Sequence, residues 1–170
     1  PGMRLDNALK TIFVNMGGVL VNGERAIGGT IADDRVIDLR TAHQGPHPLG
    51  ARCYVLATGS FFSGGLVSDA AAVREPVFDL QVDDSRPRGS WSAERLLDPR
   101  GHAFLGFGVR TDDELRALTS SGRSAANLFC CGAVLAGYDP VAEGSGGGVA
   151  VATGFKAAIG ACRQLGIGDG

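Results

Sequence analysis

The chain has 170 residues, a length that usually forms one domain and can bury a substantial core. Hydrophobic residues make up 44% and charged residues 20%, which is typical of a globular protein and unlike a disordered segment. The formal net charge of −2 provides no basic field, so nucleic acid is not expected as a partner. The sequence contains no run of about 18 apolar residues, so no membrane span is predicted. Residues 1–10 lack the apolar core of a signal peptide.

The first fifty residues predict short strands joined by turns. Residues 11–14, with the sequence TIFV, are β-branched and aromatic, which favours a strand. The dipeptide Asn-Gly at 22–23 predicts a hairpin between residues 19–21 and 25–27. Residues 35–40 alternate charged and apolar side chains, as a half-buried strand does. A loop is expected to follow, because residues 41–50 contain two glycines and two prolines.

The middle of the chain has a different pattern. Residues 53–57 and 127–131 are apolar runs, which fit strands covered on both faces, as in a parallel sheet. Between them, residues 76–82 and 104–110 predict further strands, and residues 91–97 predict a short helix. The sequence therefore predicts an α/β fold whose two most buried strands lie in the same region.

Small and apolar residues recur from Gly147 to Leu165, which predicts a long helix. A narrow face that could approach a sheet closely is expected from four small residues: Ala150, Gly154, Ala158 and Ala161. The glycine-rich start of this helix leaves backbone N–H groups free, and such a helix terminus favours an anion or a dipole.

Glycine is over-represented, with 27 residues, and several glycines follow directly after the apolar runs. The strand at 53–57 runs into Thr58 and Gly59, and the strand at 127–131 ends at Gly132. Open α/β sheets bind ligands at such strand ends, where a missing Cβ lets a flat cofactor approach the backbone. The segment GSGGGV at 144–149 is not a dinucleotide fingerprint, because valine takes the third glycine position and no strand directly precedes it.

The cysteines and histidines do not predict a metal site or a disulfide framework. No CxxC spacing occurs among Cys53, Cys130, Cys131 and Cys162, and no histidine lies near a cysteine pair. The cysteines are interpreted as small core residues in a reducing compartment, which favours the cytosol.

Four long motifs carry a resemblance to a known family. They are YVLATGSFFSGGL at 54–66, REPVFDL at 74–80, FGVRTDDEL at 107–115 and NLFCCGAVLAGYDPVAEGSGGGVAVATGFKAA at 127–158. The chain resembles flavoproteins of the fumarate reductase and succinate dehydrogenase type, and more narrowly the B subunits of anaerobic glycerol-3-phosphate dehydrogenases. The family's N-terminal βαβ unit with its GxGxxG is not in this sequence, so only the C-terminal portion is matched.

The resemblance implies a fold and a division of the chain. The expected fold is the C-terminal half of a Rossmann-like FAD/NAD(P)-binding flavoprotein domain, together with strands of an inserted substrate domain. Residues 1–50 would form a β-hairpin region. Residues 51–66 and 123–170 would form the flavin-binding portion, and residues 67–122 would form the substrate or cap portion.

The resemblance also implies a flavin cofactor, either FMN or FAD. It assigns flavin contacts to nine residues around the two strand ends and the helix start: Thr58, Gly59, Gly132, Ala133, Glu143, Gly144, Gly146, Gly147 and Gly148. Fumarate reductase-type enzymes hold a dicarboxylate with an arginine and a histidine before the final helix, and residues 137–143 contain neither. The weaker candidates for binding a phosphate ester are Arg88, His102 and Arg110. No residue is assigned as the catalytic base.

The function implied is oxidation of glycerol 3-phosphate to dihydroxyacetone phosphate, with electrons passed through a flavin to a quinone. The expected partners are catalytic and membrane-anchoring subunits and a small phosphorylated substrate. The expected location is the cytoplasm, peripheral to the inner face of the cell membrane through those subunits. Two alternatives stay open: an accessory chain that only relays electrons or holds no flavin, and another flavoenzyme of the fumarate reductase class. Uncovered strand surface would also allow a homodimer.

Overall fold

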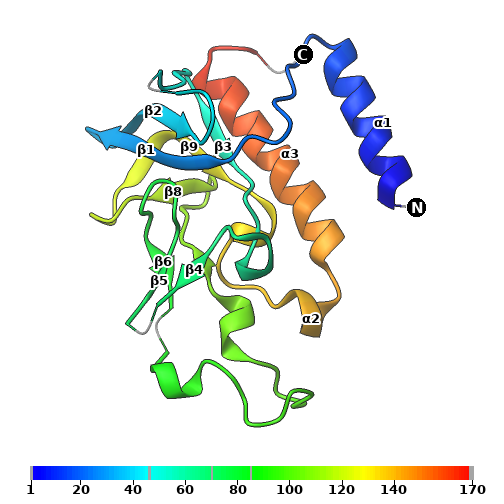
Figure 1. The fold of residues 1–170 in the computed structure, drawn as a ribbon, viewed down its shortest axis with the longest axis vertical. Coiled ribbons are helices and arrows are strands. Elements are labelled where there is room, and N and C mark those ends of the chain that lie inside the picture. The colour runs from blue at the N-terminus through cyan, green and yellow to red at the C-terminus, as the bar shows by residue number, and fades with distance from the viewer. Residues whose placement is uncertain (1, 46, 70, 85, 169–170) are drawn as a thin grey trace.

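The computed structural model describes residues 2–45, 47–69, 71–84 and 86–168. It combines helices with small mixed sheets, which confirms the α/β class (Figure 1). One sheet has three strands in the order β3-β9-β8, and three further pairs of strands, β1-β2, β4-β5 and β6-β7, surround it. Within the described part of the chain, no helix is both long and apolar enough to cross a bilayer.

The first element is a helix, α1 (Gly2–Asn15), so the strand predicted at 11–14 is wrong. Its apolar residues Leu5, Leu9 and Ile12 recur at helical spacing, and this period outweighs the β propensity of TIFV. The helix ends where Gly17 adopts a positive φ of 88° and Gly18 N–H donates to the Phe13 carbonyl oxygen at 2.9 Å. No residue of α1 is buried.

The hairpin turn of the N-terminal region lies eleven residues later than predicted, at 33–34 and not at 22–23. It joins β1 (Ala26–Ala32) to β2 (Arg35–Thr41) in an antiparallel pair, and residues 19–21 form no strand. Its two turn residues, Asp33 and Asp34, both have positive φ, of 48° and 55°, as a type I′ turn requires. The strand predicted at 35–40 is confirmed as β2, which begins directly after the turn formed by the two aspartates.

Three strands form the central sheet. Strand β3 (Tyr54–Leu56) pairs in parallel with β9 (Ser124–Cys130), and β8 (Arg116–Leu118) pairs with β9 in the antiparallel sense. Both predicted parallel strands are therefore confirmed as neighbours. β9 is buried on both faces, but β3 is an edge strand whose Val55 side chain is 48% exposed, so the expectation that residues 53–57 are covered on both faces is wrong.

The segment between these strands contains short elements. Strands β4 (Val67–Ser68) and β5 (Val73–Arg74) form one pair, and β6 (Val82–Asp83) and β7 (Gly108–Val109) form another. Only the ends of the strands predicted at 76–82 and 104–110 are extended, because turns occupy most of both stretches. No helix forms over residues 91–97; a 3₁₀ turn at Arg88–Ser90 precedes an irregular loop.

The C-terminal helices follow the central sheet. A short helix, α2 (Pro140–Glu143), leads into α3 (Gly146–Gln164), which confirms the predicted long helix. α3 lies along the sheet and packs on β9, β3 and the 3₁₀ turn Gly132–Val134 (Figure 1). The packed face differs from the predicted one: Ala157 is fully buried, whereas Ala150 and Ala158 are exposed. A Cβ at Gly160 would lie 2.5 Å from the Phe129 ring, so this glycine sets the close approach.

The core has two parts, one on each face of β9. The larger part contains Leu128 and Cys130, together with side chains from the strand pairs and loops. The smaller part, between β9 and α3, contains Phe129, Cys131 and Ala157. Adjacent residues of β9 therefore enter different parts of the core, as the alternation of a strand requires.

A buried asparagine connects the hairpin to the central sheet. Asn127 is 2% exposed, and its Oδ1 accepts a hydrogen bond from Val36 N–H at 2.8 Å. Its Nδ2 donates to the carbonyl oxygens of Val36 at 3.0 Å and Arg52 at 3.4 Å. The side chain thus pairs with the backbone of β2 as a neighbouring strand would.

We expect Asn127→Ala to lower the free energy of unfolding by about 2–4 kcal/mol, because the Val36 N–H and C=O would be buried without partners. Urea unfolding monitored by circular dichroism measures the change. Asn22→Ala, at an exposed turn position, is the matched control and should change stability little. Equal stability of the two variants would show that water replaces the Asn127 side chain.

A buried carboxylate predicts a pH dependence of stability. Glu75 is 1% exposed, and its carboxylate accepts hydrogen bonds from Val77 N–H at 2.8 Å and Phe78 N–H at 2.7 Å. Burial raises the pKa of Glu75 above its usual value, although these bonds oppose the shift. A raised pKa in the folded state means that stability is greatest below the unfolded-state pKa, near 4.5, and falls as the pH rises through the folded-state pKa.

We therefore expect the stability of Glu75→Gln to fall less than that of the unmodified protein as the pH rises from 4.5 to neutral. The variant should also lose about 1–3 kcal/mol at every pH, because an amide NH₂ cannot accept from a backbone N–H. Urea unfolding across this pH range tests both effects. The exposed Glu114→Gln serves as the control, and an identical pH profile for Glu75→Gln and the unmodified protein would contradict the prediction.

Candidate functional site

The parallel pairing of β3 and β9 brings two glycine-terminated strand ends together. Leu56 is in register with Cys130, and Cys131 N–H donates to the Leu56 carbonyl oxygen at 3.0 Å. Thr58 and Gly132 each lie two residues beyond this matched pair, so both turns leave the same edge of the sheet. This confirms the prediction that the two strand ends are neighbours. In open α/β sheets, ligands commonly bind at such an edge.

The turn after β3 is folded tightly on itself. Gly59 has a positive φ of 82°, and Gly65 N–H donates to the Ser60 carbonyl oxygen at 3.0 Å. A Cβ at Gly65 would lie 1.9 Å from the Gly59 carbonyl oxygen, so no larger residue fits there. The adjacent glycines 64 and 65 in the sequence are the signal for this close approach.

Thr58 has a buried hydroxyl that forms no hydrogen bond with any residue that the structure describes. A polar atom left this way is costly, and it indicates a missing partner. Thr58 also lines a cavity of about 570 Å³ beside the strand end. The other lining residues are Glu24, Arg25, Ala26, Ile27, Ser63, Gly64, Val67, Pro76 and Val77.

The turn after β9 meets the first turns of α3. Gly132 has a positive φ of 72°, and its N–H donates to Thr153 Oγ1 at 2.9 Å. A Cβ at Gly132 would lie 4.0 Å from Ala150. Ala133 follows in the 3₁₀ turn and is half-buried. The Gly132 N–H therefore already has a hydrogen-bond partner in Thr153, and this bond holds α3 against the strand end.

The start of α3 is open to solvent. Gly147 and Gly148 are exposed, and a Cβ at either residue would meet no atom within 4 Å. The Ser145 side chain does not cap the helix. Backbone N–H groups in the first turn of a helix have no partner within it, so this terminus can accept an anionic or polar group. Gly146 is less open than these two glycines, because a Cβ added there would lie 3.9 Å from the Pro140 side chain.

Glu143 is engaged in capping the short helix α2. Its Oε1 accepts a hydrogen bond from Asp139 N–H at 3.1 Å, and its Oε2 accepts from the Ser145 hydroxyl at 3.1 Å. The Asp139 carboxylate in turn accepts from two N–H groups of the first turn of α2. Gly144 ends the helix with a positive φ of 61°. This reciprocal pair fixes the approach to α3.

The three residues expected to bind a phosphate ester do not share one cavity. The Arg88 guanidinium lies over the Trp91 ring, 4.2 Å from its centroid, beside a cavity of about 380 Å³. His102 lines a separate cavity of about 480 Å³. Its Nδ1 accepts from Ala93 N–H at 3.0 Å, and its Nε2 lies 2.8 Å from the Leu96 carbonyl oxygen, so both ring nitrogens are occupied. Arg110 is exposed and lines neither cavity.

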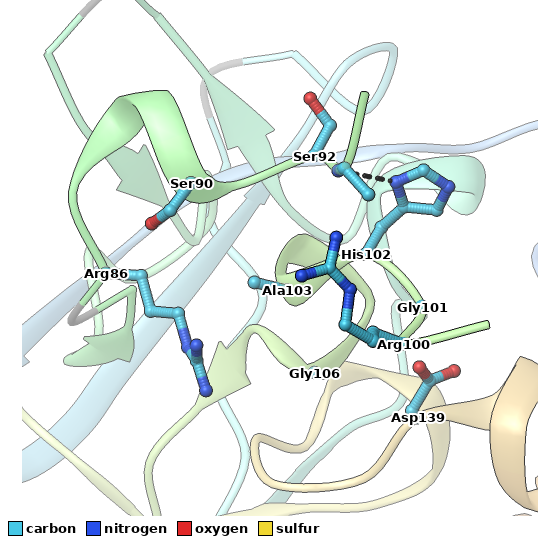
Figure 2. A pocket seen from close by; sticks show the side chains of 10 residues that line it. Arg86, Ser90, Ser92, Arg100, Gly101, His102, Ala103, Gly106 and Asp139 are labelled. Carbon is cyan, nitrogen blue, oxygen red and sulfur yellow. Dashed lines mark hydrogen bonds between the residues drawn. The ribbon is translucent and has the colours of Figure 1, made fainter. Parts of the chain in front are cut away.

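Two arginines that are not among the predicted site residues, Arg86 and Arg100, line the cavity beside His102. Figure 2 shows Arg86, Arg100 and Asp139 around it. Arg100 is bound to Asp98 through two hydrogen bonds, of 3.0 and 3.1 Å, which lower the pKa of the Asp98 carboxyl to about 2. The sequence signal that could have found these residues is the density of arginine between 86 and 100.

Thiol and metal chemistry are not indicated by the described residues. Burial raises the pKa of both the Cys130 and the Cys131 thiols, which disfavours the thiolate form that a nucleophile needs. No group of three or more His, Cys, Asp or Glu side chains in the described ranges is arranged to hold a metal ion.

Comparisons with known proteins agree with this geometry. The FAD binding domain family matches residues 1–149. Among the B subunits of anaerobic glycerol-3-phosphate dehydrogenases, that of Vibrio cholerae serotype O1 is 42% identical over 156 residues, 92% of this chain and 36% of that protein. That of Aliivibrio fischeri is 37% identical over 178 residues, 99% of this chain and 39% of that protein. The chain thus spans little more than a third of these relatives. No solved structure matches it.

These findings confirm the family resemblance and support a flavin as the cofactor. The structural features fit such a group: an unpaired hydroxyl at Thr58, a tight glycine turn at Gly59 and open helix-terminal amides at Gly147 and Gly148. The Gly132 N–H and the Glu143 carboxylate already have partners within the chain.

We expect Thr58→Val to leave the flavin-free protein as stable as before or about 1 kcal/mol more stable, because valine removes an unpaired buried hydroxyl. The same change should weaken flavin binding if the hydroxyl bonds the cofactor. Thermal unfolding and flavin titration of the full-length protein measure the two effects. A variant that loses stability but binds flavin normally would show that Thr58 serves the fold alone.

Proposed function

Since this chain belongs to the FAD binding domain family, we propose that it forms one side of the flavin site in an oxidoreductase subunit. The proposed reaction is oxidation of glycerol 3-phosphate to dihydroxyacetone phosphate, with the electrons passed to a quinone at the membrane. The names of the relatives support the substrate, and the edge formed by β3, β9 and α3 supports the cofactor. That edge is the observation on which the proposal depends.

A flavin held at this edge would supply the two-electron acceptor that oxidation of an alcohol requires. The proposed contacts of this chain are Thr58 and Gly59 after β3, Gly132 and Ala133 after β9, and residues 143, 144 and 146–148 before and in the first turn of α3. The α3 terminus would stabilise negative charge on the reduced cofactor by roughly 0.5–1 kcal/mol. The tight turns would exclude water from one side of the ring.

The substrate and partners are proposed on the same basis. Residues 67–122 would form the cap over the substrate, residues 51–66 and 123–170 the flavin-binding portion, and residues 1–50 the region that contains the β1–β2 hairpin. Arg88, His102 and Arg110 are proposed as alternative phosphate contacts, because they do not share one cavity. The occupied ring nitrogens of His102 favour a positioning role for it. The proposed partners are a catalytic and a membrane-anchoring subunit, at the inner face of the cell membrane.

The test compares the full-length protein, purified with its partner subunits, with the 170-residue chain alone. We expect the complex to contain flavin and to reduce an artificial acceptor with glycerol 3-phosphate. The chain alone should bind FMN or FAD weakly and show no turnover, because no βαβ glycine turn in its sequence holds a pyrophosphate.

Three outcomes would overturn parts of this proposal. A complex without flavin in this subunit would support an accessory chain. A flavin-containing complex that oxidises a different substrate would support another enzyme of the fumarate reductase class. Submicromolar flavin binding by the chain alone would show that the site does not need residues beyond this sequence.

We also expect Gly147→Val to weaken flavin binding at least about tenfold in the full-length protein, because a branched side chain would cover the open start of α3. Its melting temperature should change little, since a Cβ at this position meets no atom. Ala142→Val, at an exposed position in α2, is the control. Normal flavin affinity of the Gly147→Val protein would show that the start of α3 does not contact the flavin.

A further inference from the structure

A loop at one end of the molecule exposes two adjacent leucines. The side chains of Leu96 and Leu97 are 85% and 90% exposed, more than any other large apolar side chain in the described part of the chain. The segment that contains them, residues 86–102, forms the lower end of the molecule in Figure 1, away from the β1–β2 hairpin. Paired, fully exposed leucines at an extremity indicate a contact surface.

The loop is held in one shape by its own hydrogen bonds. Phe104 N–H donates to the Trp91 carbonyl oxygen at 3.0 Å, which closes its base. His102 bridges the interior by bonding both Ala93 N–H and the Leu96 carbonyl oxygen. The leucines are therefore presented by a braced loop, so little conformational freedom remains to be lost when they are covered.

The sequence around the two leucines is rich in arginine. Residues 86–100 contain four arginines, at 86, 88, 95 and 100, and all four are exposed. Two acidic residues, Glu94 and Asp98, lie in the same stretch, and Asp98 is paired with Arg100. Asp139 lines the same cavity as Arg86 and Arg100, on the side of the loop that faces α2. The rest of the chain carries an excess of acidic residues, since the net charge of the whole is −2. By sequence, four arginines against two acidic residues give this stretch a formal charge of +2, opposite in sign to that of the whole chain.

We propose that this loop binds an anionic lipid bilayer, with Leu96 and Leu97 inserted at the boundary between headgroups and acyl chains. The arginines match the charge of anionic headgroups, and the leucines match the apolar layer just below them. Two side chains at a tip cover far less area than the roughly 800 Å² per partner of a stable protein interface. The proposal goes beyond the flavin site, because it assigns to this chain a lipid contact of its own.

The experiment is flotation of the full-length protein with vesicles of phosphatidylcholine, with and without phosphatidylglycerol. We expect binding that requires phosphatidylglycerol and weakens as salt is raised. Leu96→Ser/Leu97→Ser should weaken it roughly tenfold or more, because both apolar groups are lost. Met3→Ser/Met16→Ser removes two similarly exposed apolar side chains near α1 and should bind like the unmodified protein.

Circular dichroism and flavin content check that each variant folds, which is expected because the replaced side chains are exposed. Equal flotation of the loop variant and the unmodified protein, or no flotation of either, would overturn the proposal. Loss of a partner subunit from the loop variant, without any lipid binding by the unmodified protein, would show that the surface binds a protein instead. Loss of turnover with lipid binding intact would concern the flavin proposal only.

Discussion

The parallel pairing of β3 with β9 determines where everything else in this chain can lie. β9 is the middle strand of the sheet, and its alternate side chains enter different parts of the core. The Phe129 ring packs against α3 at Gly160, where any larger residue would collide with the ring. With the helix held there, its first turns lie next to the turn at Gly132. A register shift of one residue would turn Phe129 toward the other face and remove the support of the helix.

The elements that could be predicted from the sequence are those whose pattern is long and whose environment is uniform. Strand β9 and helix α3 belong to this group, because a buried strand and a helix packed on it need continuous apolar or small residues. The prediction failed at α1 because the four residues TIFV, taken alone, hide the period that Leu5 and Leu9 establish. The hairpin was misplaced because two aspartates, Asp33 and Asp34, adopt positive φ without the glycine that usually marks such a turn.

The candidate site was predicted in outline and not in detail. The strand ends and the helix start could be named from glycine positions. Which of their polar groups already have hydrogen-bond partners depends on tertiary contacts. Thr153 lies 21 residues from Gly132 in sequence, yet its hydroxyl accepts the Gly132 N–H. The choice of face on α3 likewise depends on the position of Phe129, which no helical period reveals. For the same reason, no spacing rule could place Arg86 and Arg100 around one cavity.

The position of Trp91 has a consequence for spectroscopy. It is the only tryptophan in the sequence and is 8% exposed. Its indole N–H donates to the Arg86 carbonyl oxygen at 2.7 Å, and its ring packs edge-on against Phe107, with the ring centroids 5.3 Å apart. Indole emission depends on the polarity around the ring, and this ring sits at the base of the leucine-bearing loop. In this chain, the wavelength of indole emission is therefore a label-free signal of the state of that loop.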